Sequence, residues 1–210
     1  MARFALPTDR ALGISVPKLR RLARELGQDH RLAQALWRLR ILEARHLAGM
    51  VDEPERVTER QTKRWAKDFD SWEVCDGCSF NLFVRTRFAW PKAREWSRRR
   101  EKFVKRASFA LMAALAVHDK EAPDERFLRL LASIERAAGD DRNFVKKAVN
   151  WALRQIGKRN RRLNRAAIAS ARRIRKQGSR AARWIAADAL RELESPVVQR
   201  RLRAEKLSLL

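Results

Sequence analysis

Apolar residues recur along most of the chain at the spacing of an amphipathic helix. In residues 15–26 they fall on one helical face, as Leu19, Leu22, Ala23 and Leu26. Ser15 is suited to cap the start of this helix and Gly27 to end it. The same spacing predicts further helices over residues 32–37, 41–50, from Thr58 through Trp65, 71–84, from Trp90, 101–118, 123–138, 143–158, 164–176 and 179–194. Strand-like alternation is missing, so the fold class is predicted to be all-α.

Two internal repeats sharpen this prediction. Residues 103–107 recur at 144–148, an offset of 41, and residues 152–156 recur at 189–193, an offset of 37. Periods near 40 in a helical chain indicate stacked helix pairs of HEAT or armadillo type. We therefore expect one domain over residues 1–210, a curved superhelix of antiparallel helix pairs (an α-solenoid) with a concave basic face. A plain helical bundle with chance similarity between its helices is the alternative.

Composition narrows the class of protein. Lys and Arg number 49 against 25 Asp and Glu, a net charge of +24, yet 45% of the residues are hydrophobic and seven are Trp. This apolar content excludes a disordered basic tail. The chain lacks an apolar run of the ~20 residues that span a membrane, and its first residues lack the apolar core of a signal peptide. We expect a cytoplasmic, nucleoid-associated protein.

The positive charge is concentrated in the C-terminal third. Residues 142–206 hold twenty basic residues and four acidic ones, a local net charge of +16. Self-repulsion of this size does not stabilise a fold, so it favours a polyanionic partner. Arg suits bidentate phosphate contacts, and Trp151 and Trp184 offer stacking surfaces among the cations. Nucleic acid is the predicted partner; an Arg-rich proteome is the alternative explanation.

Most residue patterns that carry catalysis are missing. Cys75 and Cys78 form one C-x-x-C pair without the further ligands of a zinc site, so we expect two buried thiols. The three histidines are scattered, and neither a Gly-rich phosphate loop nor a nucleophile elbow is present. The sequence therefore predicts no metal and no cofactor.

One acidic residue stands out in this basic chain. On a helix that starts near Ser71, Trp72 and Asp76 are four residues apart and share a face. A carboxylate beside an indole is an unusual element of a phosphate-binding wall. The alternative is structural, with Asp76 paired to an arginine such as Arg106 and Trp72 in the core.

Four motifs resemble the DNA alkylation repair family, the HEAT-like repeat DNA glycosylases typified by AlkD. They are residues 13–20 (GISVPKLR), 68–76 (DFDSWEVCD), 103–107 (FVKRA) and 143–154 (NFVKKAVNWALR). They occur in the family's order over about residues 10–200, and the last is the most specific. The family's curved stack of helix pairs agrees with the repeats.

The resemblance implies a set of site residues. In the family an aspartate and two tryptophans contact the deoxyribose of the lesion, and an arginine holds the adjacent backbone. By motif these are Asp76, Trp72, Trp151 and Arg106, with Lys105 as the near miss for the arginine. The family also has an N-terminal tyrosine; this chain contains no Tyr, so Phe4 is the suggested replacement.

The resemblance also implies a function. It predicts a monofunctional glycosylase that hydrolyses the N-glycosidic bond of cationic N3- or N7-alkylated purines in double-stranded DNA. We expect a monomer without metal or membrane partner, and the DNA-binding cations are predicted to be Lys105, Lys146, Lys147, Arg154, Lys158, Arg159 and Arg183. A non-catalytic solenoid for branched or distorted DNA is the alternative, since the family tyrosine is missing.

Overall fold

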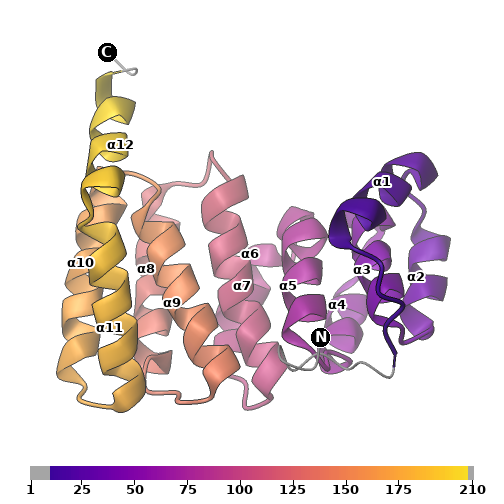
Figure 1. Ribbon diagram of the computed structural model, residues 1–210, viewed down its shortest axis with the longest axis horizontal. Helices are drawn as coiled ribbons and strands as arrows, with labels where there is room; N and C mark the ends of the chain where they lie inside the picture. The colour runs from indigo at the N-terminus through magenta and orange to yellow at the C-terminus, as the bar shows by residue number, and fades with distance from the viewer. Residues whose placement is uncertain (1–9, 208–210) are drawn as a thin grey trace.

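The computed structural model describes residues 10–207, which form helices joined by short turns (Figure 1). The helices are α1 Val16–Leu26, α2 His30–Arg38, α3 Leu42–Val51, α4 Glu59–Lys67, α5 Trp72–Asn81, α6 Ala89–Glu95, α7 Lys102–His118, α8 Asp124–Ala137, α9 Asn143–Gly157, α10 Arg161–Lys176, α11 Arg180–Leu193 and α12 Pro196–Leu207. Three 3-10 turns are η2 Pro54–Arg56, η3 Phe83–Arg85 and η4 Trp96–Arg98. Over residues 10–207 no strand is present, and no helix has the length and apolar character needed to cross a bilayer.

Local capping explains where several helices begin. The side chain of Thr58 accepts a hydrogen bond from the Gln61 amide at 3.1 Å, and Ser179 accepts one from the Ala182 amide at 3.1 Å. These bonds satisfy amides that have no partner within the first helical turn. At the end of α1, Gly27 takes φ +69°, a conformation that residues with a Cβ rarely adopt. The helix start predicted at Thr58 and the helix end predicted at Gly27 are confirmed. Ser15, predicted to cap α1, makes no side-chain cap hydrogen bond.

The structure differs from the predicted elements at three places. Helix α5 ends at Asn81 because Leu82 leaves helical geometry, with φ −121° and ψ −65°. Helix α10 starts at Arg161, three residues before the predicted start, because Asn160 caps it through the Leu163 amide. Helix α12 was not predicted; Pro196 opens it at the first position, where its missing N–H removes no helical bond.

The helix pairs stack side by side into an α-solenoid of two layers (Figure 1). Helices α3, α5, α7, α9 and α11 pack against one another in order and form the first layer, while α2, α6, α8 and α10 lie behind them in the second layer. The first repeat places Phe103 of α7 beside Phe144 of α9, with ring centroids 5.7 Å apart. The second repeat falls on α9 and α11, which are also neighbours. The repeats therefore mark successive helix pairs, as predicted.

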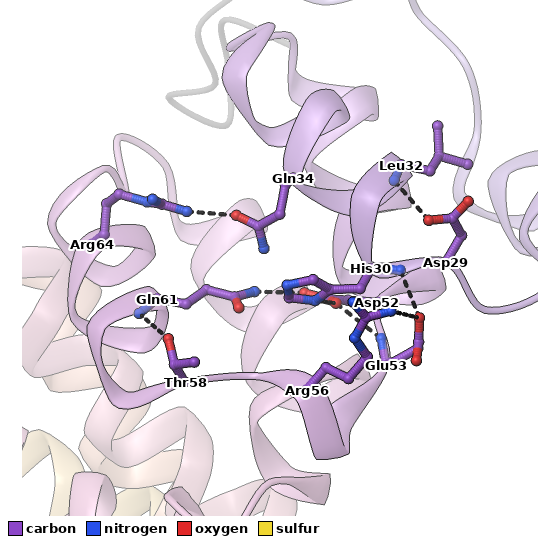
Figure 2. Close-up of polar contacts among 10 residues, drawn as sticks. All are labelled: Asp29, His30, Leu32, Gln34, Asp52, Glu53, Arg56, Thr58, Gln61 and Arg64. Atoms are coloured by element: carbon purple, nitrogen blue, oxygen red, sulfur yellow. Dashed lines mark hydrogen bonds and ion pairs between the residues drawn. The ribbon is translucent and has the colours of Figure 1, made fainter.

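A polar network joins α2, the segment that follows α3, and α4 (Figure 2). The fully buried carboxylate of Asp52 lies 2.7 Å from Nδ1 of His30 and accepts a hydrogen bond of 2.6 Å from Nε2 of Gln61. Burial raises the pKa of Asp52, and the bonds from His30 and Gln61 oppose that rise. The network satisfies a polar group that would otherwise destabilise the core, and we assign it a structural role.

Gly157 lies where α9, α10 and α11 meet. A Cβ at this position would lie 2.8 Å from the Cβ of Ala167 and 2.7 Å from Cδ2 of Leu193. We expect Gly157→Ala to lower the free energy of unfolding by about 1–3 kcal/mol, because extra volume in a packed interface forces displacement. Urea denaturation measures the change.

Gly139 provides the matched control for this substitution. An added Cβ there meets no atom within 4 Å, so Gly139→Ala should leave the urea midpoint almost unchanged. Equal urea midpoints for the two variants would mean that α9, α10 and α11 accommodate the added methyl group without loss of stability.

Candidate functional site

Helix α5 presents the residues that the sequence singled out. Ser71 caps its start by accepting a hydrogen bond from the Val74 amide at 3.3 Å. From this start Trp72 and Asp76 share a face, as predicted, and Phe80 continues it one turn further. The first layer places this face beside α7.

Arg106 of α7 clamps the Asp76 carboxylate. Its Nε donates to Oδ1 of Asp76 at 2.8 Å and its Nη2 donates to Oδ2 at 2.6 Å, while its Nη1 donates to the carbonyl of Phe144 at 2.6 Å. The guanidinium carbon lies 5.8 Å from the centroid of the Trp72 ring. Three of the five guanidinium N–H donors are therefore used within the protein, and the clamp joins α5, α7 and α9.

The Asp76 carboxylate is paired but still reached by solvent. Its side chain is 17% exposed, whereas that of Arg106 is 8% exposed. Burial raises the pKa of Asp76 above its ordinary value of 3.8, and the bonds from Arg106 partly offset this rise. The pairing of Asp76 with Arg106 that the structural alternative expected is present, and the Asp76 side chain keeps partial exposure to solvent.

Trp151 of α9 reaches the same face of the stack through Phe80. The two rings are parallel within 7°, with centroids 4.9 Å apart, and the His118 ring lies edge-on to Phe80 at 5.7 Å. Sequence reasoning missed Phe80, although its position four residues after Asp76 placed an aromatic ring on the site face. The structure thus joins Trp72, Asp76, Phe80 and Trp151 in one surface of an acid and three aromatic rings.

Several predicted DNA-binding cations have partners within the protein. Lys105 donates to Oδ2 of Asp140 at 2.9 Å, Lys158 donates to Oε1 of Glu192 at 2.6 Å, and Arg154 pairs with Glu192 and with Asp188. These pairs tie α7 to the turn before α9 and α9 to α11. The charge of each of these cations is partly compensated in the folded protein.

Arg159 forms a structural clamp. Its guanidinium donates to the carbonyls of Ala116, Lys120 and Ala122 at 3.1, 2.7 and 3.2 Å, and lies 4.4 Å from the Phe127 centroid. Burial lowers the pKa of Arg159. These bonds satisfy carbonyls at the end of α7 and in the loop before α8.

Other predicted cations are open to solvent. Lys147 is exposed and lies one turn before Trp151 on the same face of α9. Lys146 lies 5.0 Å from the centroid of the exposed Trp184 ring, and the exposed Arg183 donates to the carbonyl of Gly178. The cations nearest the aromatic surface are therefore available to a ligand.

The cysteines are two buried thiols, as predicted. Burial raises the pKa of both Cys75 and Cys78, which suppresses the reactive thiolate. Within residues 10–207 no group of three His, Cys, Asp or Glu side chains is arranged to hold a metal ion. Phe4, the suggested replacement for the family tyrosine, lies outside the described residues.

Comparison with known proteins decides the family. The family model described as "DNA alkylation repair enzyme" matches residues 1–193. The chain belongs to this family. A comparison with curated proteins finds no significant match.

A solved structure supports the fold of this family member. It is described as part of a new family of proteins related to the HEAT-like repeat DNA glycosylases with affinity for branched DNA structures. The match has a TM-score of 0.70 at 16% identity and covers 87% of this chain and 83% of that one. The fold is therefore a solenoid of HEAT-like helix pairs.

Proposed function

We propose that this protein is a monofunctional DNA glycosylase that removes cationic N3- or N7-alkylated purines from duplex DNA. The observation that carries the proposal is the solvent-reached carboxylate of Asp76, held by Arg106 and flanked by the Trp72 ring. Membership of the DNA alkylation repair family supports both the partner and the reaction class.

The chemistry needs few catalytic groups. An alkylated purine that carries a positive charge leaves as a neutral base when the C1′–N bond breaks with its electron pair, so no general acid is required. A water oxygen bonds to C1′ and releases its proton. The carboxylate of Asp76 stabilises the developing positive charge on the sugar and orients this water.

The aromatic surface also stabilises the positive charge that develops on the sugar. Indole faces attract cations by about 0.5–2 kcal/mol. Trp72 shares the α5 face of Asp76, and Trp151 of α9 stacks on Phe80, one turn further along that face. Two N–H donors of Arg106 are not used by Asp76 or Phe144 and can contact the adjacent phosphate. Because water attacks C1′ directly, the product is an abasic site in an unbroken strand.

A second candidate is a non-catalytic protein that binds branched DNA. Both oxygens of the Asp76 carboxylate accept hydrogen bonds from Arg106, which offsets part of the charge needed for catalysis. The chain also contains no tyrosine to take the place of the family's N-terminal one. The solved structural neighbour is described as having affinity for branched DNA. In this second candidate function the basic surface binds DNA and Asp76 has no catalytic role.

One assay separates the two candidates. Duplex DNA methylated at guanine N7 is incubated with the wild-type protein, and released 7-methylguanine and abasic sites are measured. Release above the spontaneous rate, without strand cleavage, supports the glycosylase. Duplex binding without any release would establish the binding protein.

DNA affinity should depend on the uncompensated cations. We expect Lys147→Gln to weaken duplex binding severalfold for every sequence. Each lost phosphate contact should also make the slope of log affinity against log salt shallower by about 0.9. Fluorescence anisotropy at four salt concentrations measures both quantities.

Lys158→Gln is the control because Glu192 already compensates this lysine. Its effect on affinity should be the smaller of the two. A larger loss for Lys158→Gln than for Lys147→Gln would contradict the assignment of the DNA-binding face.

A further inference from the structure

A second basic groove lies in the second layer of the stack, between α6–η4 and α8. It has a volume of about 530 Å³ and is lined by Pro91, Arg94, Glu95, Arg98, Arg129, Ala132, Ser133 and Arg136. On each side the lining positions follow the i, i+3, i+4, i+7 spacing of a single helical face. Two helices therefore present parallel stripes to the same groove.

The groove continues into a smaller hollow of about 330 Å³ beside Trp90. Arg126 lines this hollow, and its guanidinium lies 5.0 Å from the Trp90 centroid. The indole is itself fixed, because its Nε1 donates to Oδ2 of Asp119 at 2.9 Å and its ring meets Phe127 edge-on. Arg126 is thereby held at the edge of the groove.

The groove carries an uncompensated positive charge. Five arginines line the two hollows, and Glu95 is the one acid among the lining residues. The buried ammonium of Lys92 binds the Glu95 carboxylate but also that of Glu59, so it offsets only part of the Glu95 charge. Within residues 10–207, Arg94 and Arg98 form no ion pair with a carboxylate, and Arg129 has only a longer-range attraction to Glu125. Arg154 of α9, in contrast, is paired to α11.

We propose that this groove binds the sugar–phosphate backbone of a second DNA segment. Arginine forks match phosphate oxygens bidentately, and clustered arginines without acidic partners destabilise a surface unless an anion covers them. Seven residues of helix extend about 10 Å, the length of about three phosphates along one strand.

The position of the groove indicates that it binds a second DNA segment and not the DNA segment that contacts Asp76. Asp76, Arg106 and Trp151 lie in the first layer, while α6 and α8 form part of the second layer. The site and the groove thus lie in different helix layers, and we infer that a straight duplex seated on the first layer does not reach the groove. A junction whose arms diverge can place one arm on each layer. This inference rests on the DNA binding proposed above.

The test compares a four-way junction with a linear duplex of equal arm sequence. Arg94→Gln/Arg129→Gln removes two groove cations that line both hollows. Arg31→Gln/Arg38→Gln is the matched control, since both arginines are exposed on α2 of the second layer and lie outside the groove. Thermal unfolding checks that both variants fold.

We expect the groove variant to lose about tenfold in junction affinity and about 1.8 in the salt slope, with linear-duplex affinity within about twofold of wild type. The control should change neither. Unchanged junction affinity, or equal losses on both DNAs, would overturn this inference alone. A wild type that binds neither DNA would overturn the proposed function and the inference with it.

Discussion

Replacing Asp76 with asparagine should reduce the release of 7-methylguanine by about 10²–10³-fold, the usual effect of removing one preorganised electrostatic group from an active site. Asparagine keeps the size of the side chain but removes the negative charge that faces the developing oxocarbenium ion. Single-turnover release from methylated duplex, with protein in excess of both the DNA and the dissociation constant, isolates the chemical step from binding.

The substitution also breaks an ion pair, so stability has to be measured alongside activity. Leaving one partner of a buried pair without the other costs about 3–5 kcal/mol, and the cost here is smaller because Asp76 is 17% exposed. Asp140→Asn is the matched control: it breaks the pairs of Asp140 with Lys105 and Arg142, outside the aromatic surface. Release by the Asp140 variant should persist. Full activity of Asp76→Asn would refute the role assigned to this carboxylate.

The pH profile of the same reaction gives an independent signature. Burial raises the pKa of Asp76 in the folded protein above 3.8, and only the ionised form stabilises the sugar cation. Glycosylase activity should therefore be full well above this raised pKa and fall as pH decreases through it. The acid limb should disappear in Asp76→Asn, whose residual rate contains no titrating carboxylate at this position.

Replacing Trp65 with alanine should lower the free energy of unfolding by about 3–5 kcal/mol. The Trp65 side chain is fully buried, and its ring is stacked on that of Trp37 with centroids 4.0 Å apart and planes within 1°. Its ring is also tilted by 43° against that of Phe83, with centroids 6.4 Å apart. A loss of this size is a large part of the roughly 5–15 kcal/mol that stabilises a domain, and urea denaturation followed by circular dichroism measures it.

Trp184 is the control for the same deletion at the surface. It is 40% exposed and contacts Lys146 through a cation–π interaction, which is worth about 0.5–1 kcal/mol at exposed sites. We expect Trp184→Ala to change the unfolding free energy by no more than this amount. Similar losses for both tryptophans would show that the Trp37–Trp65 stack contributes little beyond surface contacts.

Local sequence features predicted the helices because their causes are local. The Thr58 and Ser179 caps act within three residues, and apolar stripes act within two turns. Helix α12 was not predicted from the sequence because a Ser-Pro pair such as Ser195–Pro196 marks the end of one helix and the start of another equally well. The repeats at offsets of 41 and 37 predicted the stacking of α7, α9 and α11, since helices of similar sequence bury the same face against their neighbours in a repeat protein.

The candidate site was predicted in part. The four-residue spacing of Trp72 and Asp76 is sufficient to place them on one face, and the same spacing rule also places Phe80 there. The bidentate geometry of the Arg106 clamp required the tertiary structure, because its partners Asp76 and Phe144 lie 30 residues before and 38 residues after it. The register between neighbouring helices sets such contacts.

Sequence alone determined that the chain is helical, repetitive and strongly basic, since composition and short-range spacing carry that information. It did not determine which cations remain available to a ligand. Arg154 pairs with Glu192 of the next first-layer helix, 38 residues later, while Arg94 lines the groove between α6 and α8 without an ion pair to any carboxylate of residues 10–207. Compensation between charges depends on distances of a few ångströms across helices, and only the packing of the helix layers decides those distances.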